Sequence, residues 1–438
     1  MSKKISSEFI GSLFSTYTSQ VVSLLSSFLQ VILINRNFGV DIYGQLVVVA
    51  STAGFFSSLL TARSSETVAL FFKREQLEGN DESSKFILFL GLFVDLLTAV
   101  VLVLLIYALS NFIATAFLQD SDLSDEITLY SYITFFVFLR GPFLGYLKAK
   151  EMFLQINIVT MVESVTKVFL IAILIFYTTQ LDLKRIVAAF LIASIAAFLV
   201  TIIFASASYA EDYKRDRFVV KFNRRLLKEY WNFNLKTFAS STLKAGSGNI
   251  DNLVLGYFLN AESAGVYQTM RKLFFPLSFL TSPLSMLMLS KMITAYKKKQ
   301  FKKLNKIISN TNRCLVAPIC LISVAVYFLA RPYLRYQNIK IADDFNIVFS
   351  LMLLYFVLSA FQWWIRNFVV MHRPAIPIYT NALLSFNSIW IPILLFNLSY
   401  FDSRGLIAIS LASVLAYFPS WLIGIIVYHR FIKLKGVS

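Results

Sequence analysis

Residues 86–109 read FILFLGLFVDLLTAVVLVLLIYAL, an apolar run in which Asp95 is the only acidic or basic residue. A helix needs about 20 predominantly apolar residues to cross the hydrocarbon core of a bilayer. Comparable runs recur along the chain and predict twelve membrane spans, at residues 9–35, 42–62, 86–109, 127–147, 153–177, 186–208, 232–258, 265–290, 308–330, 345–365, 375–397 and 405–428. The sequence therefore predicts an all-α integral membrane protein.

The composition is hydrophobic and basic at once. Of the 438 residues, 57% are hydrophobic and only 15% are charged, yet the formal net charge is +17. A disordered chain has low hydrophobicity, so disorder is excluded. A soluble nucleic-acid binder carries its basic residues on a polar surface, so the composition argues against that class as well. Two cysteines and two histidines are too few for a disulfide scaffold or a cysteine-rich metal protein.

The basic residues are sorted between the two sides of the predicted bundle. With the N-terminus in the cytoplasm, the inner segments carry 27 Lys and Arg residues and the outer segments carry 7. Cytoplasmic loops are enriched in Lys and Arg, so both termini are predicted to be cytoplasmic. The apolar stretch after Met1–Lys4 is too long for the core of a cleavable signal peptide, and we expect it to remain as the first span.

The basic segment 209–231 lies at the middle of the chain and predicts a cytoplasmic linker. It separates an N-terminal lobe (1–208) from a C-terminal lobe (232–438), each with six spans. A short internal repeat supports this division, because FGVDIYG (38–44) and LNAESAG (259–265) follow the first span of their lobes. Lobes with an even number of spans share one orientation, as in transporters built from parallel repeats. We therefore predict twelve transmembrane helices in two six-helix lobes related by a parallel repeat.

Common enzyme motifs do not occur in the sequence. It contains no GxxxxGK[ST] phosphate-binding loop, no HExxH and no GxSxG. The predicted outer loops are also too short to hold a catalytic domain. We expect a protein that is not an enzyme and that has no catalytic residues, no metal and no cofactor.

Ionisable residues inside the predicted spans are the first candidates for function. A charge at the centre of a bilayer is unfavourable by about 3 kcal/mol and usually faces a cavity or a partner. The acidic residues Asp95, Glu163 and Asp251 are predicted counter-ions or carriers of a coupling H+ or Na+ ion. The excess of cations favours an anionic substrate. The cations predicted to contact that substrate are Arg140, Lys167, Lys236, Lys244, Arg271 and Lys272 within the spans, together with Arg63 at the inner end of span two.

The seventh span is unusually polar. Its run STLKAGSGN (241–249) is poorly suited to contact lipid, and Lys236, Lys244 and Asp251 fall on one helical face. We predict a bent helix that lines a cavity. The alternative is that Lys236 snorkels to the inner surface while Lys244 pairs with Asp251.

The first span carries an uncharged polar stripe. Taken alone, such a stripe favours a helix–helix interface packed on small hydroxyl groups. Because this span corresponds to the seventh in the repeat, a shared cavity is our preferred interpretation of both. The stripe consists of Ser12, Ser15, Ser19, Ser23, Ser26 and Gln30.

Two other sites contain neighbouring charges. Arg271 and Lys272 lie together in the outer half of the eighth span and indicate an anionic ligand, since Arg and Lys are the usual partners of phosphate. Glu163 and Lys167 are four residues apart on one helix and can pair. For that pair, a structural ion pair and a functional site remain alternatives.

The inner ends of spans nine and ten carry amphipathic side chains. Arg313 is expected to snorkel to the membrane surface. Phe361, Trp363 and Trp364 predict an interfacial aromatic belt, with sugar stacking as the alternative.

Two segments resemble a known family. RNFGVDIYG (36–44) with the first two spans, and NIDNLVLGYFLNAESAGVYQTMRK (249–272), resemble Wzx-type flippases for O-antigen or capsule repeats. These flippases belong to the multidrug/oligosaccharidyl-lipid/polysaccharide (MOP) exporter superfamily, whose twelve-span pattern covers the whole chain. The resemblance implies that Asp251 takes the family's acidic position in span seven. It also implies that Arg63 and Arg271 lie in segments that carry cavity cations.

The resemblance also implies a function. The chain would move an undecaprenyl-diphosphate-linked oligosaccharide from the cytoplasmic to the outer leaflet of the bacterial inner membrane by alternating access. Its partners would be that lipid-linked oligosaccharide, membrane lipids and other polysaccharide-assembly proteins, and no nucleic acid. The alternatives are a multidrug or small-molecule antiporter of the same superfamily, and a membrane polysaccharide polymerase or ligase. An excess of buried cations argues against cationic drugs, and short outer loops argue against a polymerase.

Overall fold

The computed structural model describes residues 2–434 apart from 62–63, 178–181, 213–222, 243–248, 282–287, 289–291, 293–294, 297, 340–343, 362, 366–367, 369–375 and 399–403. By its internal contacts the chain divides into two compact units, Met1–Ala245 and Gly246–Ser438. Every regular element in the described residues is a helix, so the predicted helical class is confirmed. The proposed lobe boundary at 209–231 stays a prediction.

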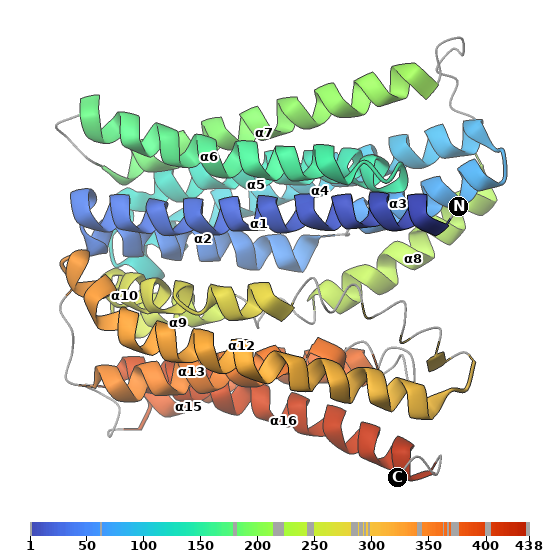
Figure 1. Cartoon of the computed structure of the whole chain (residues 1–438). Coiled ribbons are helices and arrows are strands. Elements are labelled where there is room, and N and C mark those ends of the chain that lie inside the picture. The colour runs from blue at the N-terminus through green and yellow to red at the C-terminus, as the bar shows by residue number, and fades with distance from the viewer. Residues whose placement is uncertain are drawn as a thin grey trace. The chain divides into compact units, whose positions relative to one another are not determined.

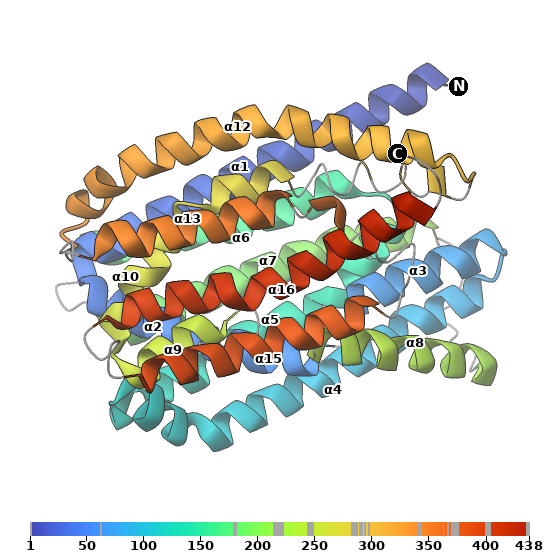
Figure 2. The same cartoon turned by 90° about the horizontal axis from the view of Figure 1, so that it is seen from below.

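The first unit is a bundle of long helices (Figures 1 and 2). Within it α1 packs on α6, α4 on α5, and α7 on both α5 and α6. A π-helical turn, Ala114–Leu118, and a 3-10 turn, Ser121–Leu123, connect α4 to α5. Its α-helices are α1 (Ser2–Phe38), α2 (Val40–Leu60), α3 (Ser64–Leu77), α4 (Asp81–Ile113), α5 (Ser124–Ala149), α6 (Phe153–Tyr177), α7 (Leu183–Asp212) and α8 (Arg224–Thr242).

The second unit is also helical (Figure 2). In this unit α16 packs on α13 and α15, and α9 packs on α10, α15 and α16. Its helices are α9 (Ile250–Phe258), α10 (Ala261–Lys272), α12 (Phe301–Tyr336), α13 (Phe345–Phe361), α15 (Ile376–Phe396) and α16 (Gly405–Leu434).

Nine helices within the described ranges are long and apolar enough to cross a membrane. They coincide with predicted spans one to six, nine, ten and twelve, and α15 coincides with span eleven. Predicted span seven falls partly on α8 and partly on α9, while span eight begins in α10. The segment predicted as an inner loop after span two contains a further helix, α3. These findings establish a multi-pass membrane protein.

Helix α4 shows how the apolar sequence is used. The side chains of Phe89, Phe93 and Leu104 are exposed, whereas Leu102 and Ile106 are fully buried. A soluble protein rarely exposes large contiguous apolar surface. The exposed face of α4 is therefore the one that meets lipid.

Both copies of the short internal repeat lie where one helix ends and the next begins. Gly39 has φ 90° and ends α1, and Val40 begins α2 immediately afterwards. This left-handed conformation favours glycine, which has no Cβ. In the second copy, Asn260 caps α10, its side chain accepting a 2.8 Å hydrogen bond from the backbone of Ser263. Both copies are tight connections between consecutive helices.

Helix α8 begins inside the predicted linker and is joined to α3, within the first unit, by an ion pair. Arg74 on α3 lies 3.0 Å from the carboxylate of Glu229 on α8, and Arg225 lies 3.0 Å from the same group. These hydrogen bonds from Arg225 and Arg74 lower the pKa of Glu229 below its ordinary value of 4.5. At its other end α8 contacts α2, where Thr242 donates a 3.0 Å hydrogen bond to the carbonyl of Leu59.

Close packing of α3 against α5 requires a glycine. A Cβ atom added to Gly145 would lie 2.8 Å from the carbonyl oxygen of Ser65 and 2.9 Å from Cβ of Val68. The same interface contains an edge-to-face contact between Phe72 and Tyr146, with ring centroids 5.1 Å apart. Both rings are fully buried.

Replacing Gly145 with alanine is expected to lower the free energy of unfolding by about 1–3 kcal/mol, because an overpacked interface must shift backbone. Thermal unfolding of the purified protein in detergent measures this effect. Ser206→Ala, at an exposed position on α7, is the control and should change stability by less than about 0.5 kcal/mol. Equal melting temperatures for the two variants would contradict the packing argument.

Aromatic side chains form much of the interior of the second unit. The ring of Phe274 stacks on Phe356 at 5.1 Å, and Trp364 contacts Tyr428 at 4.6 Å. Trp363 and Trp364 are both buried. The expectation that they form an interfacial belt is therefore wrong, because their rings pack inside the unit.

Candidate functional site

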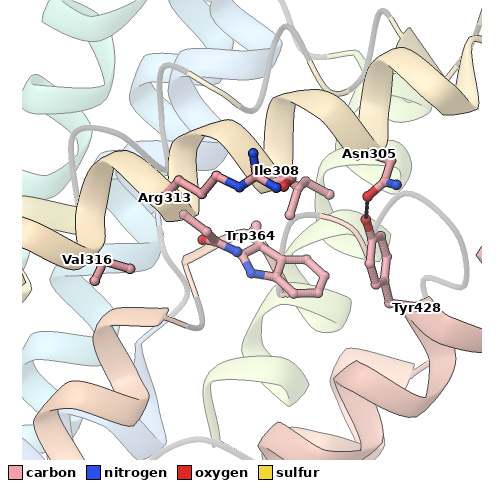
Figure 3. Close-up of a pocket in the computed structure, with 8 residues that line it drawn as sticks. Asn305, Ile308, Arg313, Val316, Trp364 and Tyr428 are labelled. Carbon is pink, nitrogen blue, oxygen red and sulfur yellow. Dashed lines mark hydrogen bonds between the residues drawn. The ribbon is translucent and has the colours of Figure 1, made fainter.

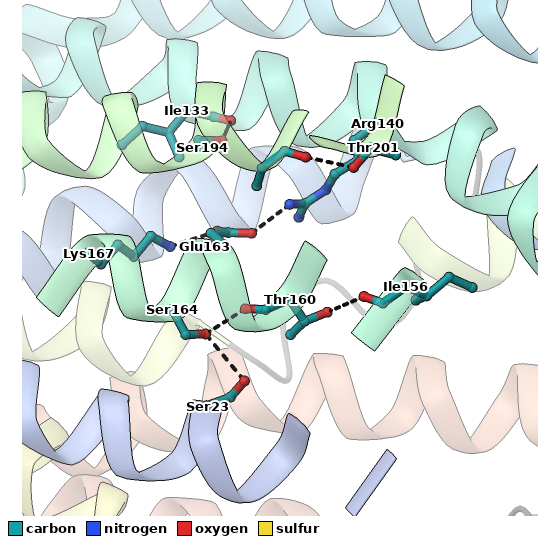
Figure 4. A network of polar contacts seen from close by, with 11 residues as sticks. Ser23, Ile133, Arg140, Ile156, Thr160, Glu163, Ser164, Lys167, Ser194 and Thr201 are labelled. Atoms are coloured by element: carbon teal, nitrogen blue, oxygen red, sulfur yellow. Dashed lines mark hydrogen bonds and ion pairs between the residues drawn. The ribbon is translucent and has the colours of Figure 1, made fainter. Parts of the chain in front are cut away.

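Three charged residues of the first unit meet between α5 and α6 (Figure 4). The Nη1 atom of Arg140 lies 2.7 Å from Oε2 of Glu163, and the Nζ atom of Lys167 lies 2.7 Å from Oε1 of the same carboxylate. Their side chains are 13%, 17% and 20% exposed in the order Arg140, Glu163 and Lys167. We call these residues the charge triad.

The charge triad carries more positive than negative charge, since two cations share one carboxylate. In addition, the Nε atom of Arg140 is buried and has no hydrogen-bond partner within the described part of the chain. A guanidinium group presents its N–H donors in a fixed fork that suits carboxylate and phosphate. The net positive charge and this unpaired N–H group make the charge triad our candidate site for an anion.

Local sequence explains part of this geometry. Glu163 and Lys167 are one turn apart on α6, so their predicted pairing is confirmed. Arg140 reaches them from α5, where it precedes Gly141 and Pro142. The contact of Arg140 with this pair was not predicted, because the separation of 23 residues between Arg140 and Glu163 gives no local signal of contact.

The polar stripe of α1 packs on α6 beside the triad. Ser19 donates to Oδ1 of Asn157 at 3.1 Å, and the amide nitrogen of Asn157 donates to Ser15 at 3.0 Å. Further along the same two helices, Ser164 donates to Ser23 at 3.3 Å. These hydroxyl groups join two helices, so the alternative interpretation of the stripe as a helix–helix interface is the correct one for them.

Asp95 occupies a second buried polar site in the first unit. Its side chain is 4% exposed, and its Oδ1 atom accepts a hydrogen bond from the hydroxyl of Ser64. Gly141 faces it so closely that an added Cβ would lie 2.7 Å from Oδ2. In the residues that the structure covers, Asp95 has no cationic partner, although it was predicted as a counter-ion for the buried cations.

In the second unit, Arg271 on α10 lies 3.4 Å from the carboxylate of Asp251 on α9. Both side chains are largely buried. Asp251 therefore pairs with Arg271, whereas the sequence suggested Lys244 as an alternative partner. Because the charges cancel, this pair lacks the positive excess of the triad. Lys272 follows Arg271 at the end of α10.

The remaining predicted cations are not defined at side-chain level. Arg63 and Lys244 lie outside the described residues, and Lys236 is placed only as a backbone position on α8. Their roles stay predictions. No group of three His, Cys, Asp or Glu residues that could hold a metal ion occurs in the described ranges.

Several solved structures share this fold. An inward-facing multidrug resistance MATE family transporter of the MOP superfamily superposes with a TM-score of 0.76 at 14% identity, covering 95% of this chain and 96% of that one. Lipid II flippase MurJ in an inward closed conformation superposes with a TM-score of 0.73 at 16% identity, covering 96% of this chain and 87% of that one. The MATE multidrug transporter DinF-BH superposes with a TM-score of 0.63 at 15% identity, covering 97% of this chain and 95% of that one. The protein therefore has the fold of the MOP superfamily.

Sequence comparison defines the family more narrowly. The model of the family described as "Polysaccharide biosynthesis protein" matches residues 10–288, and the chain belongs to this family. No curated protein matches the sequence.

Proposed function

We propose that this chain is a flippase for a polyprenyl-diphosphate-linked oligosaccharide, an O-antigen or capsule repeat on undecaprenyl diphosphate. The observation that carries the proposal is the positive excess of the charge triad, inside a membrane-embedded bundle of the polysaccharide biosynthesis family. The fold that the chain shares with lipid II flippase MurJ supports it.

The chemistry of the substrate matches the triad. A diphosphate needs positive charge and N–H donors, and charge-assisted hydrogen bonds to phosphate are about twice as strong as neutral ones. Arg140 and Lys167 supply both, while Glu163 holds them in place when no substrate is bound. The polyprenyl tail stays in the lipid, because only the head group needs a polar path.

We place the protein in the inner membrane with both termini in the cytoplasm, as the distribution of its basic loops predicts. The head group then enters from the cytoplasmic leaflet and leaves toward the outer leaflet by alternating access. Asp95 is our candidate for the carrier of a coupling ion, since it is a buried carboxyl group bonded to a hydroxyl. A proton is the favoured ion because a single carboxylate gives a poor ligand set for Na+.

The experiment that tests this function is a leaflet assay in proteoliposomes. The purified chain is reconstituted with a polyprenyl-diphosphate oligosaccharide that carries a fluorophore on its glycan, and a membrane-impermeant quencher reports the fraction in the outer leaflet. We expect the protein to make the inner-leaflet pool accessible, and protein-free vesicles to retain it. A protein that fails to move this lipid while it exports cationic drugs from cells would instead be a multidrug antiporter.

A further inference from the structure

A pocket in the second unit carries chemistry that the proposed function does not use. It has a volume of about 320 Å³ and lies between α12, the segment just beyond α13, and α16 (Figure 3). This volume is within the range of small-molecule sites. Its lining consists of Asn305, Ile308, Ser309, Asn312, Arg313, Val316, Trp364 and Tyr428.

Two asparagine side chains of the pocket use their amide oxygens in hydrogen bonds to neighbouring aromatic residues, which leaves their NH2 groups as donors. The Nε1 atom of Trp363 donates to Oδ1 of Asn312 at 2.7 Å, and the hydroxyl of Tyr428 donates to Oδ1 of Asn305 at 2.7 Å. An indole N–H can only donate, so Asn312 must present its oxygen to Trp363. Each amide then keeps its two N–H groups for another acceptor.

Arg313 adds a positive charge that no described residue neutralises. Its side chain lines the pocket beside Trp364, and it has no hydrogen bond or ion pair with any residue that the structure describes. The lining contains no acidic residue. A site with donors, a guanidinium group and no carboxylate selects an oxyanion such as phosphate.

The surroundings indicate an amphiphile rather than a free ion. From the lining residue Val316 onward, α12 exposes apolar side chains with the spacing of one helical face, including Val324 and Phe328. On the other side, the start of α12 and the residues just before it are rich in lysine: Lys298, Lys299, Lys302, Lys303 and Lys306. The pocket thus lies where α12 changes from basic to apolar, as at a membrane surface.

We propose that this pocket binds the phosphate of an anionic membrane lipid, with Arg313 and the amides of Asn305 and Asn312 on the phosphate and the lipid chain along the apolar row of α12. The phosphate can come from a phospholipid or from a polyprenyl diphosphate. This inference does not rest on the proposed transport function, because it concerns lipid binding alone.

Lipid retention by the full-length purified protein tests the proposal. Native mass spectrometry compares binding of phosphatidylglycerol, phosphatidylcholine and undecaprenyl diphosphate. We expect phosphatidylglycerol, which has a net negative charge, to bind at least about fivefold more tightly than phosphatidylcholine, whose choline ammonium neutralises its phosphate, because one Lys or Arg near an anionic lipid surface contributes about 1 kcal/mol. Arg313→Gln should lose this preference. Arg335→Gln, the same change at an exposed position near the other end of α12, should keep it.

A second variant separates binding from folding. Asn312→Asp keeps the oxygen that accepts from Trp363 but replaces the free amide donors with negative charge, so it should weaken phosphatidylglycerol binding while the melting temperature stays unchanged. Competition identifies the source of the phosphate: displacement of phosphatidylglycerol by undecaprenyl diphosphate assigns the site to the polyprenyl lipid, and failure to displace it assigns the site to phospholipid. Equal retention of phosphatidylglycerol by the wild type and Arg313→Gln would overturn the proposal.

Discussion

Arg140→Gln is expected to reduce transport of a lipid-linked oligosaccharide about tenfold or more in the leaflet assay. The change leaves the Glu163–Lys167 pair intact, so folding is preserved, but it removes the positive excess of the charge triad. A hydrogen bond from a charged donor contributes about 1.5–3 kcal/mol, and about 1.4 kcal/mol corresponds to a factor of ten. Lys167→Gln leaves the Arg140–Glu163 pair instead, and should lower transport by a similar factor if net charge governs binding.

The matched control is Lys184→Gln. Lys184 also pairs with a carboxylate, Asp125, at 3.6 Å, but its side chain is 59% exposed. Exposed ion pairs contribute about 0–1 kcal/mol, so this variant should transport and unfold like the wild type. Wild-type transport by Arg140→Gln at normal expression would remove the triad from the mechanism, while slow transport by all three variants would indicate a general loss of charge.

Gly141→Ala is expected to lower the free energy of unfolding by about 1–3 kcal/mol. The new methyl group would lie 2.7 Å from Oδ2 of Asp95, a carboxyl group that is buried and held by Ser64. The effect should disappear when Asp95 is replaced with alanine, because that change removes the atoms in conflict. Melting temperatures of the four proteins in the double-mutant cycle measure this coupling.

A second substitution of Asp95 tests whether this residue carries the coupling proton. Asp95→Asn keeps the shape of the side chain and an oxygen for the hydroxyl of Ser64, but it cannot release a proton. We expect this variant to remain folded and to lose the acceleration that a pH gradient gives to transport. If the effects of Gly141→Ala and Asp95→Ala on the melting temperature simply add, the two residues are not in contact. If transport by Asp95→Asn still responds to the pH gradient, Asp95 is not the carrier of the coupling proton.

The sequence was most informative about local structure. Long apolar runs such as residues 86–109 identified most of the helices, because crossing a bilayer demands length and hydrophobicity from one continuous segment. The pairing of Glu163 with Lys167 followed from the period of one helix. The family resemblance was confirmed through residues 10–288.

Contacts between helices were not predictable in the same way. Arg140 reaches Glu163 from another helix, and Ser64 reaches Asp95 across a separation of 31 residues. Helical phase defines which face a residue occupies but not which neighbour that face meets. For this reason the sequence favours a cavity lining for the stripe of α1, although Ser19 and Ser23 form hydrogen bonds with α6. For the same reason it offers Lys244 as an alternative ion-pair partner of Asp251, although Asp251 pairs with Arg271.

The carboxylate of Glu163 competes with any bound anion for the two cations of the charge triad. Each of its oxygens already bonds one cation, Arg140 or Lys167, so an anion that binds these cations must exchange with a group attached to the protein. The free energy of binding is then the difference between two similar interactions. Such exchange limits the residence time of any anionic cargo, because Glu163 remains beside the cations to replace it. A carrier benefits from this competition, since release on the far side is a required step of every cycle.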